Sequence, residues 1–410
     1  MTRAALNLWL LSAVVCAWRT HGHADHGSRQ DGAANSISLV TAANKELAFR
    51  LYRTLAARAD SRGKNIFYSP VSVSVALAAL SVGARGETHR QLFNGLGFNS
   101  TRLTQRDVDQ VFKTLLEKAE KTSDETVSEG TAVFVDDRFS PRPEFMETLM
   151  QSYSADGFTV DFTQTKESAN AINKYVEEKT KGKIDRLVDD IDPSTVMYLT
   201  SYIYFKGEWA TPFDPQLTKE EMFSVDENTK VPVKMMNMED TFDTYYDQTM
   251  NTSVLHLPFN SSHSMMLLLP NDMEAVENVI CPSHINKWLR WTKPRIYQVS
   301  IPKFSMKTSY SLADALMQMG MTDMFGSAAD FSGIAEGQDL SVSDVVHKAA
   351  LDVDEAGATA AAATGIGITP HSIRHIPVLK FDRPFMVIVT ERDTENVLFL
   401  GKMVDPTGAE

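Results

Sequence analysis

The chain of 410 residues has only two cysteines, and one of them, Cys16, lies in an apolar run near the N-terminus. A scaffold held together by several disulfides is therefore excluded, and stability must come from a hydrophobic core. The sequence also has no linker rich in Pro, Gly or Ser, no block of like charge and no repeat of fixed period. These absences favour one large domain over two or three smaller ones.

An excess of basic residues is missing as well. The chain has 40 Lys and Arg against 53 Asp and Glu, which gives a formal net charge of −13. Nucleic-acid binding requires a concentrated positive surface, so we expect no nucleic-acid partner. No stretch after the N-terminal run is long and apolar enough to span a bilayer, so we expect no membrane partner either.

Short motifs of common catalytic sites are also absent. The sequence contains no G-x-S-x-G, no P-loop, no G-x-G-x-x-G after a strand and no H-E-x-x-H. His371 and Ser372 are adjacent, but neighbours in an extended segment point apart, and no orienting acid is evident. His21, His23 and His26 have no Cys or carboxylate at ligand spacing. We therefore predict a protein that is not an enzyme and that uses no metal and no cofactor.

The N-terminus predicts secretion. Arg3 precedes ALNLWLLSAVVCAW, an apolar run of signal-peptide length, and small residues offer cleavage sites between 17 and 24. We expect a signal peptide at 1–24, a flexible tail at 25–40 and a single domain at 41–410. Extracellular export agrees with three glycosylation sequons, which begin at Asn99, Asn251 and Asn260.

Helical patterns dominate the first half of the chain. Ser69 and Pro70 form an N-cap and first-turn pair before VSVSVALAALSVG, which is apolar on nearly all sides and predicts a buried helix. In LTQRDVDQVFKTLLEKAEK, apolar residues recur at helical spacing. The charges of its other face are of both signs, as on a solvated surface.

Strand patterns follow. They are the β-rich runs TAVFVDD, STVMYLTSYIYF, VPVKMM, SVLHLPF, SMMLLLP and YQVSIPKFSM. Two dense apolar strands, RPFMVIVT and NVLFLGKMV, lie near the C-terminus, and LSVSDVVHKAALDVDE is long enough to form a central strand. The sequence therefore predicts an α+β fold with large antiparallel sheets.

The segment GATAAAATGIG, at 357–367, consists almost entirely of small residues. Its glycines weaken a helix, and alanine alone is a poor strand former. Placed between two existing strands, however, the segment would present Ala358, Ala360, Ala362 and Thr364 on one face. All four are small and uncharged, so they could enter a sheet without displacing core atoms or burying a charge. We favour a loop able to insert into a sheet over a flexible tether.

The longest stretches of the chain resemble the serpin family, most closely its secreted antitrypsin-like group. These stretches are NIFYSPVSVSVALAALSVGARGETHRQL, AINKYVEEKTKGKI, SYIYFKGEWATPF, VPVKMMNM, VHKAALDVDEAG and FDRPFMVIVTERDTENVLFLGKMVDPT. The resemblance implies a fold of three β-sheets and eight or nine helices, with an exposed reactive-centre loop at about 356–377.

The resemblance also implies a mechanism of suicide inhibition. A serine protease cleaves the loop and forms an acyl-enzyme, and the N-terminal part of the loop then inserts into the main sheet and traps the protease. We accordingly expect an extracellular monomer whose partner is an extracellular serine protease, bound covalently. The alternative is a non-inhibitory member that carries a small hydrophobic hormone.

Family positions transfer to this chain residue by residue. The reactive bond falls at His371-Ser372, with Arg374-His375 as the alternative if the loop is longer before the cleaved bond. The hinge that would enter the sheet comprises Glu355, Gly357, Ala358, Thr359, Ala360, Ala361, Ala362, Ala363 and Thr364.

The resemblance implies two further sites that control opening of the sheet. One, the shutter beneath the sheet, would contain Ser69, Ser72, Ser201 and His347. The other, the breach at its upper end, would contain Trp209 and an ion pair between Lys303 and Glu355. Ser201 stands where the family usually has Asn. We expect this shorter side chain to leave room for a water or to let the sheet open more easily.

Overall fold

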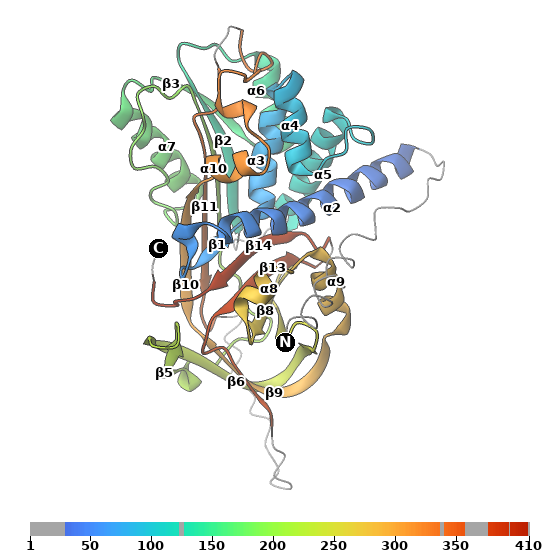
Figure 1. The fold of residues 1–410 in the computed structure, drawn as a ribbon, viewed down its shortest axis with the longest axis vertical. Helices are drawn as coiled ribbons and strands as arrows, with labels where there is room; N and C mark the ends of the chain where they lie inside the picture. The colour runs from blue at the N-terminus through green and yellow to red at the C-terminus, as the bar shows by residue number, and fades with distance from the viewer. Residues whose placement is uncertain (1–28, 123–126, 337–339, 357–375, 393, 409–410) are drawn as a thin grey trace, which may run out of the picture.

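The computed structural model describes residues 29–122, 127–336, 340–356, 376–392 and 394–408. These residues form two β-sheets surrounded by helices (Figure 1). Helices α3 to α6 gather beside the upper half of the molecule, and strands β5, β6 and β9 lie at its opposite end (Figure 1). The α-helices among the described residues are α2 (Arg29–Ala56), α3 (Pro70–Gly83), α4 (Gly86–Leu96), α5 (Gln105–Thr122), α6 (Pro143–Tyr153), α7 (Thr165–Lys179), α8 (Met273–Glu277), α9 (Pro282–Trp291) and α10 (Ala313–Gln318). Three short 3-10 helices accompany them: η1 (Ala59–Ser61), η2 (Pro215–Leu217) and η3 (Asp323–Phe325).

The five-stranded sheet is the one that bears on function. Its strands are, in spatial order, β10 (Phe304–Ser311), β11 (Asp344–Val353), β4 (Met197–Phe205), β2 (Val127–Asp136) and β3 (Asp156–Val160). The central strands β11 and β4 are parallel, whereas β10 pairs with β11, and β2 with β4, in antiparallel fashion. The parallel pair joins segments that are far apart in the sequence.

The second sheet has nine strands. They are β1 (Ile66–Tyr68), β14 (Val397–Met403), β13 (Phe385–Glu391), β8 (His263–Pro270), β7 (Thr252–Pro258), β6 (Lys230–Asp247), β9 (Lys293–Pro302) and β12 (Val378–Lys380), with β5 (Lys219–Ser224) also paired to β6. The three sheets expected from the sequence are the five-stranded sheet and two arms of this one. Strand β6 joins the arms, because its C-terminal end pairs with β7 and the rest of it with β5 and β9.

The five-stranded sheet is covered on both faces. One face packs against α7 in a cluster that includes Phe134, Tyr202 and Ile172. The opposite face contacts two further apolar clusters, one centred on the helices and the other on the nine-stranded sheet. Every residue of β4 is therefore buried, which explains why its sequence is a nearly continuous apolar run instead of an alternating one.

Helix α3 follows the sequence prediction closely. The Ser69 side chain accepts a hydrogen bond from the Ser72 backbone N–H, and Pro70 occupies the first turn. Most residues of the helix are buried, as its apolar composition on all sides requires. It places Ser72 directly beneath the five-stranded sheet.

The flexible tail expected at 25–40 overlaps a helix in the described residues. Helix α2 begins at Arg29 and continues to Ala56 without a break. Val40 belongs to the main apolar cluster, and Ile37 and Leu39 pack against that cluster. These apolar contacts hold the helix to the core, and the polar composition of the preceding residues concealed this.

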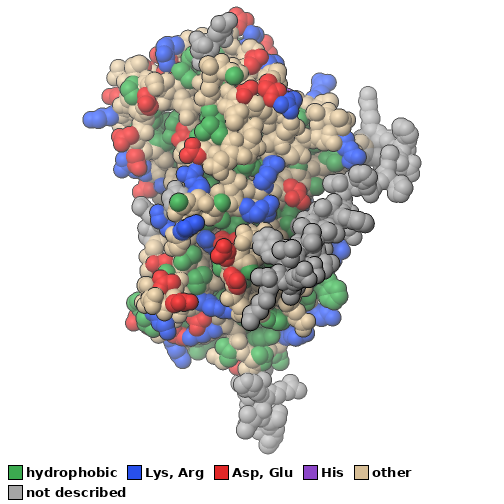
Figure 2. Space-filling view, viewed as in Figure 1, with side chains coloured by type: hydrophobic (Ala, Val, Ile, Leu, Met, Phe, Trp, Pro, Cys, Tyr) green, Lys and Arg blue, Asp and Glu red, His purple; other side chains and the backbone are tan. Residues whose placement is uncertain are grey.

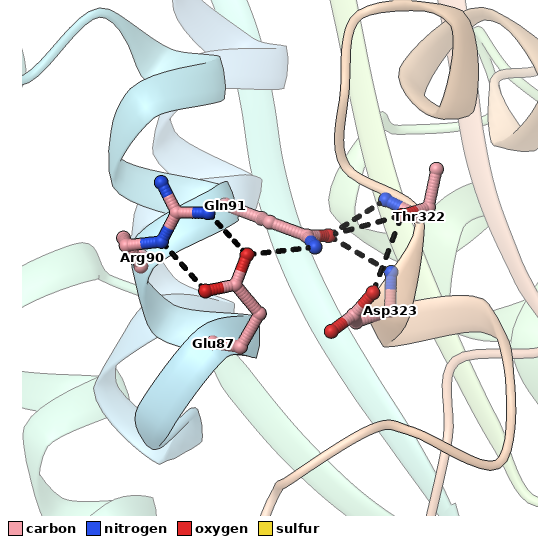
Figure 3. A network of polar contacts seen from close by, with 5 residues as sticks. All are labelled: Glu87, Arg90, Gln91, Thr322 and Asp323. Atoms are coloured by element: carbon pink, nitrogen blue, oxygen red, sulfur yellow. Dashed lines mark hydrogen bonds and ion pairs between the residues drawn. The ribbon is translucent and has the colours of Figure 1, made fainter.

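A polar network connects α4 to the turn before η3 (Figure 3). Gln91 Oε1 accepts hydrogen bonds from the backbone N–H groups of Thr322 and Asp323, each at 2.9 Å. Glu87 holds the other end of the Gln91 side chain and pairs with Arg90. The network fixes the turn before η3 against α4.

Charges of both signs are interspersed over the face drawn in Figure 2, without a large area of one sign. In the part of the chain that the structure describes, no helix combines the length and the apolar character needed to cross a membrane.

Candidate functional site

Strand β11 leads directly into the segment of small residues. It is hydrogen-bonded to β4 from Asp344↔Tyr198 to Leu351↔Phe205, so the two strands are immediate neighbours. The boundary between them is the place where a further strand could enter the sheet. The shutter and breach residues lie along this boundary.

At the upper end of the boundary, Glu355 is held by three contacts. Lys303 Nζ lies 2.9 Å from Glu355 Oε2, the pair expected from the sequence, and Thr218 Oγ1 donates to Oε1 at 2.9 Å. The Glu355 carbonyl accepts a hydrogen bond from the Phe213 backbone N–H at 3.1 Å. Burial acts to raise the pKa of the Glu355 carboxyl, but the hydrogen bond from Lys303 helps to hold this pKa below its usual value. The first residue of the predicted hinge is thus anchored as an anion.

Trp209 also holds the C-terminal end of β11. Its indole Nε1 donates to the Asp354 carbonyl at 2.7 Å, and its backbone N–H donates to the Ala356 carbonyl at 3.0 Å. The indole is buried and stacks on Phe259, with ring centroids 4.6 Å apart. Lys206 Nζ pairs with the Asp354 carboxylate at 3.1 Å. The chain is therefore held in place as far as Ala356.

The four shutter residues form one continuous buried network. Ser201 Oγ lies 2.8 Å from Ser72 Oγ and 3.0 Å from His347 Nδ1. The other ring nitrogen, Nε2, accepts the Ser69 backbone N–H at 3.0 Å. Ser201 and His347 are paired residues of β4 and β11, so the network crosses the boundary between the two strands. The short Ser201 side chain reaches both partners directly, and nothing in the geometry calls for a bridging water.

The protonation state of His347 follows from this geometry. Burial lowers its pKa from 6.5 to about 3, although the hydrogen bond with Ser201 acts in the opposite direction. The imidazole is neutral at physiological pH. Because Nε2 accepts from Ser69, Nδ1 carries the proton and donates to Ser201. The donors and acceptors of the network are paired with one another, and its atoms are buried. The network is therefore suited to hold β4, β11 and the start of α3 together and not to act on a substrate.

The remaining predicted site residues fall outside the described residues. They are Gly357, Ala358, Thr359, Ala360, Ala361, Ala362, Ala363, Thr364, His371, Ser372, Arg374 and His375. Their roles as hinge and reactive bond stay predictions.

Each of the three sequon asparagines is exposed. Asn99 Oδ1 accepts hydrogen bonds from the backbone N–H and the hydroxyl of Thr101, the third residue of its sequon. Asn251 and Asn260 flank β7 at its two ends. An oligosaccharide at any of these positions would extend into solvent. Within the described residues, no group of His, Cys, Asp and Glu is arranged to hold a metal ion.

Three residues at the breach were not predicted from the sequence. Thr218 donates to Glu355, Asp354 accepts from Trp209, and Lys206 pairs with Asp354, but the three residues come from separate segments. The paired acidic residues of DVDE after a long apolar strand were the only signal, and they do not reveal which lysine each one meets.

Comparison with known proteins identifies the family. Residues 42–406 match the family model described as "Serpin (serine protease inhibitor)". Serpin A3-8 of Bos taurus is 38% identical over 387 residues, which cover 93% of this chain and 92% of that protein. Hibernation-specific plasma protein HP-55 of Tamias sibiricus is 37% identical over 407 residues, 98% of each chain.

Solved structures agree with the sequence matches. Human thyroxine-binding globulin, in complex with thyroxine, superimposes with a TM-score of 0.85 at 34% identity, over 91% of this chain and 100% of that one. Human kallistatin superimposes with a TM-score of 0.83 at 36% identity, over 91% of this chain and 99% of that one. Mouse protein Z-dependent protease inhibitor gives 0.84 at 29% identity, over 93% and 100%. With its antitrypsin-like sequence relatives and this fold, the chain belongs to the serpin family.

Proposed function

We propose that this serpin is a secreted inhibitor that traps an extracellular serine protease by cleavage and insertion of its reactive-centre loop. The observation that carries the proposal is the direct parallel pairing of β11 with β4. The strand that precedes the loop thereby forms one wall of the boundary at which the loop would enter.

The direction of the strands explains why insertion would be favourable. A segment that turns back after β11 runs antiparallel to β11 and, because β4 is parallel to β11, antiparallel to β4 as well. Insertion therefore replaces one parallel ladder with two antiparallel ladders, which are more stable per residue. The number of buried backbone hydrogen bonds also increases, and this drives the change after the loop has been cut.

The side chains of the segment suit this path. Ala358, Ala360 and Ala362 would face the core and require no cavity larger than a methyl group. A charge at one of these positions would have to be buried without a partner, at a cost of several kcal/mol. The hinge of this chain carries no such charge between Ala356 and Thr364.

His371 is the bait residue that we propose for the protease, with Ser372 after the cleaved bond. Arg374 followed by His375 is the alternative, and it would suit a protease with an acidic specificity pocket. The two assignments differ in the peptide that cleavage releases, which begins at Ser372 in one case and at His375 in the other. Secretion through the segment 1–24 would bring the protein to extracellular proteases.

The test is to incubate the purified secreted protein separately with trypsin, chymotrypsin, elastase and thrombin. Denaturing electrophoresis is expected to show a detergent-stable complex with at least one of them, and mass spectrometry of the released C-terminal peptide identifies the bond. Cleavage by all reactive proteases without a stable complex would overturn the proposal.

A matched pair of hinge variants tests the insertion step itself. Ala360→Glu places a charge on the face that would be buried and is expected to convert the inhibitor into a substrate, as is Ala358→Arg. Ala361→Glu places the same charge one residue further, on the face that packs against α7. Lys348 and Asp352 of β11 are only partly buried on that face, so this variant should keep more of the complex. Equal complex formation by the Ala360→Glu and Ala361→Glu variants would contradict insertion in this register.

The second candidate function is carriage of a small hydrophobic hormone. Its support is the structural similarity to thyroxine-binding globulin, whose solved structure holds thyroxine. The two functions differ in heat stability after loop cleavage. An inhibitor becomes markedly more stable because its loop inserts, whereas an unchanged unfolding temperature after cleavage would favour the carrier.

A further inference from the structure

A cavity of about 360 Å³ lies beneath β2, between the helical cluster and the nine-stranded sheet. This volume is in the range of sites for small organic ligands. Apolar walls are contributed by Val75 of α3, Phe112 and Leu115 of α5, and Leu398 of β14. The cavity borders Ser72 but contains no other residue of the shutter, and it is separate from the breach.

One wall of this apolar cavity carries a carboxylate, Glu129. Side chains of β2 alternate, and Val133 and Val135, on the same face as Glu129, belong to the helical apolar cluster. Glu129 is directly opposite Ile203 of β4 in the antiparallel register. A charged side chain therefore occupies a position at which the pattern of the strand calls for an apolar residue.

Glu129 has no partner that neutralises it. Its carboxylate makes no hydrogen bond and no ion pair with the described residues, and the residue is half-buried. The nearest charge that acts on it is a second carboxylate, Glu391 of β13, which also lines the cavity. Burial and Glu391 together raise the pKa of Glu129 from 4.5 to about 7.

The other polar groups of the cavity do not supply a cation inside it. Burial lowers the pKa of His263 on β8, so this ring is neutral at physiological pH. Burial raises the pKa of Tyr153, so its hydroxyl stays protonated, and it donates to Asp109. Lys118 and Lys179 are exposed and stand at the outer edge, where Lys179 pairs with Asp156 at 3.0 Å.

A further polar atom in the wall is without a partner. Asn396 is about nine-tenths buried, and its Oδ1 accepts no hydrogen bond from the described residues. Together with Glu129 and Glu391, it gives the cavity wall three acceptor groups, of which only Glu391 accepts a side-chain hydrogen bond from a described residue, the hydroxyl of Thr394. Such a set of oxygens is complementary to an ammonium group, which has three donors and a positive charge.

We propose that this cavity is a binding site for a small organic amine, with the ammonium group at Glu129 and Glu391 and an aromatic or aliphatic body between α3, α5 and β14. An anionic ligand is disfavoured by the two carboxylates, and a purely apolar ligand would leave Glu129 unpaired. The proposal does not depend on inhibition of a protease, because neither the hinge nor the reactive bond takes part in it.

The experiment uses three probes of the same shape: 4-phenylbutylamine, 4-phenylbutan-1-ol and 4-phenylbutyrate. Calorimetric titration of the full purified chain at pH 8 should show one site for the amine. We expect its Kd to be at least about tenfold lower than that of the alcohol, and no binding of the butyrate. Glu129→Gln keeps the shape of the side chain and should raise the Kd of the amine about tenfold while leaving that of the alcohol unchanged.

Glu117→Gln is the matched control, because Glu117 is an exposed carboxylate on α5, outside the cavity lining. It should leave amine binding unchanged. Lowering the pH from 8 to 6 should weaken amine binding to the parent chain, since Glu129 then gains a proton, but not binding to the Glu129→Gln variant. Absence of saturable amine binding, equal binding of the alcohol or the butyrate, or an unchanged Kd in the Glu129→Gln variant would overturn the proposal.

Discussion

Two neighbouring rows of side chains on one face of the five-stranded sheet differ in whether their polar groups have hydrogen-bond partners. In one row, Thr131, Ser201 and His347 lie opposite one another on β2, β4 and β11. In the next row, the same strands contribute Glu129, Ile203 and Ala349. Ser201 and His347 of the first row are fully buried and hydrogen-bonded to each other, whereas the half-buried carboxylate of Glu129 in the second row has no partner among the described residues.

A polar group whose hydrogen bonds are satisfied within the protein has a structural role, whereas one without a partner is available to a ligand. His347 and Ser201 satisfy each other and also bond to groups at the start of α3, which links the sheet to the helices. A matched buried network stabilises one arrangement, whereas an unmatched buried charge lowers stability until something binds it. Because of this difference, we propose that the first row takes part in control of the sheet and the second in binding of a ligand.

Removing the centre of the matched row should have the largest effect. His347→Ala leaves the Ser69 N–H without its partner, removes one of the two hydrogen bonds of the Ser201 hydroxyl and opens a cavity at a fully buried position. We expect the free energy of unfolding to fall by about 3 kcal/mol. Chemical denaturation measures it. The control is Ser343→Ala, which removes one hydrogen bond to the backbone of Val196 at a more exposed position. A loss no greater than in the control would contradict the network.

The two rows should respond to pH with opposite signs. His347 has a folded pKa of about 3 against 6.5 when unfolded, so its contribution to stability is present above pH 6.5 and is lost as pH falls towards 3. Glu129 has a folded pKa of about 7 against 4.5, so its contribution is present below pH 4.5 and is lost as pH rises through 7. Between pH 4.5 and 6.5 the two contributions therefore oppose each other.

Single variants sharpen this contrast. Over that interval, Glu129→Gln should make stability fall more steeply on acidification than in the parent, by up to about 1.4 kcal/mol per pH unit. His347→Asn should change the slope by a similar amount in the opposite direction. Denaturation curves at several pH values give the slopes for the three proteins. Parallel stability profiles would show that neither group titrates as its surroundings require.

The breach contains an ion pair near the surface, and its loss is expected to lower stability by less than the loss of His347. Glu355→Lys removes the ion pair with Lys303 and adds like charge beside it, which should cost about 1 kcal/mol and loosen the top of the sheet. Polymers are then expected after mild heating, detected by native electrophoresis. The reversed pair, Glu355→Lys with Lys303→Glu, should restore the monomer. A single variant that stays monomeric would show that the pair does not hold the sheet closed.

Elements whose structure depends on nearby residues could be predicted from the sequence. The capped, wholly apolar helix α3, the buried strand β4 and the final pair of strands all follow from composition and periodicity. The resemblance then placed Glu355 beside Lys303 and Ser201 beside His347, and the structure has both contacts. The helical start of α2 was missed, because its polar residues show no sign of the distant core that Ile37 and Leu39 reach.

By itself, the sequence determined the α+β class, the family and the small-residue segment, because each depends on residue types at fixed spacing along the chain. Only the tertiary structure decided that β4 and β11 are neighbours, since a parallel pair joins distant segments and no local pattern records the partner. The tertiary structure likewise decided the surroundings of Glu129. In the sequence this residue is an ordinary acid near a strand. In the structure α3, α5 and β14 enclose it in a cavity, and no cation among the described residues forms an ion pair with it.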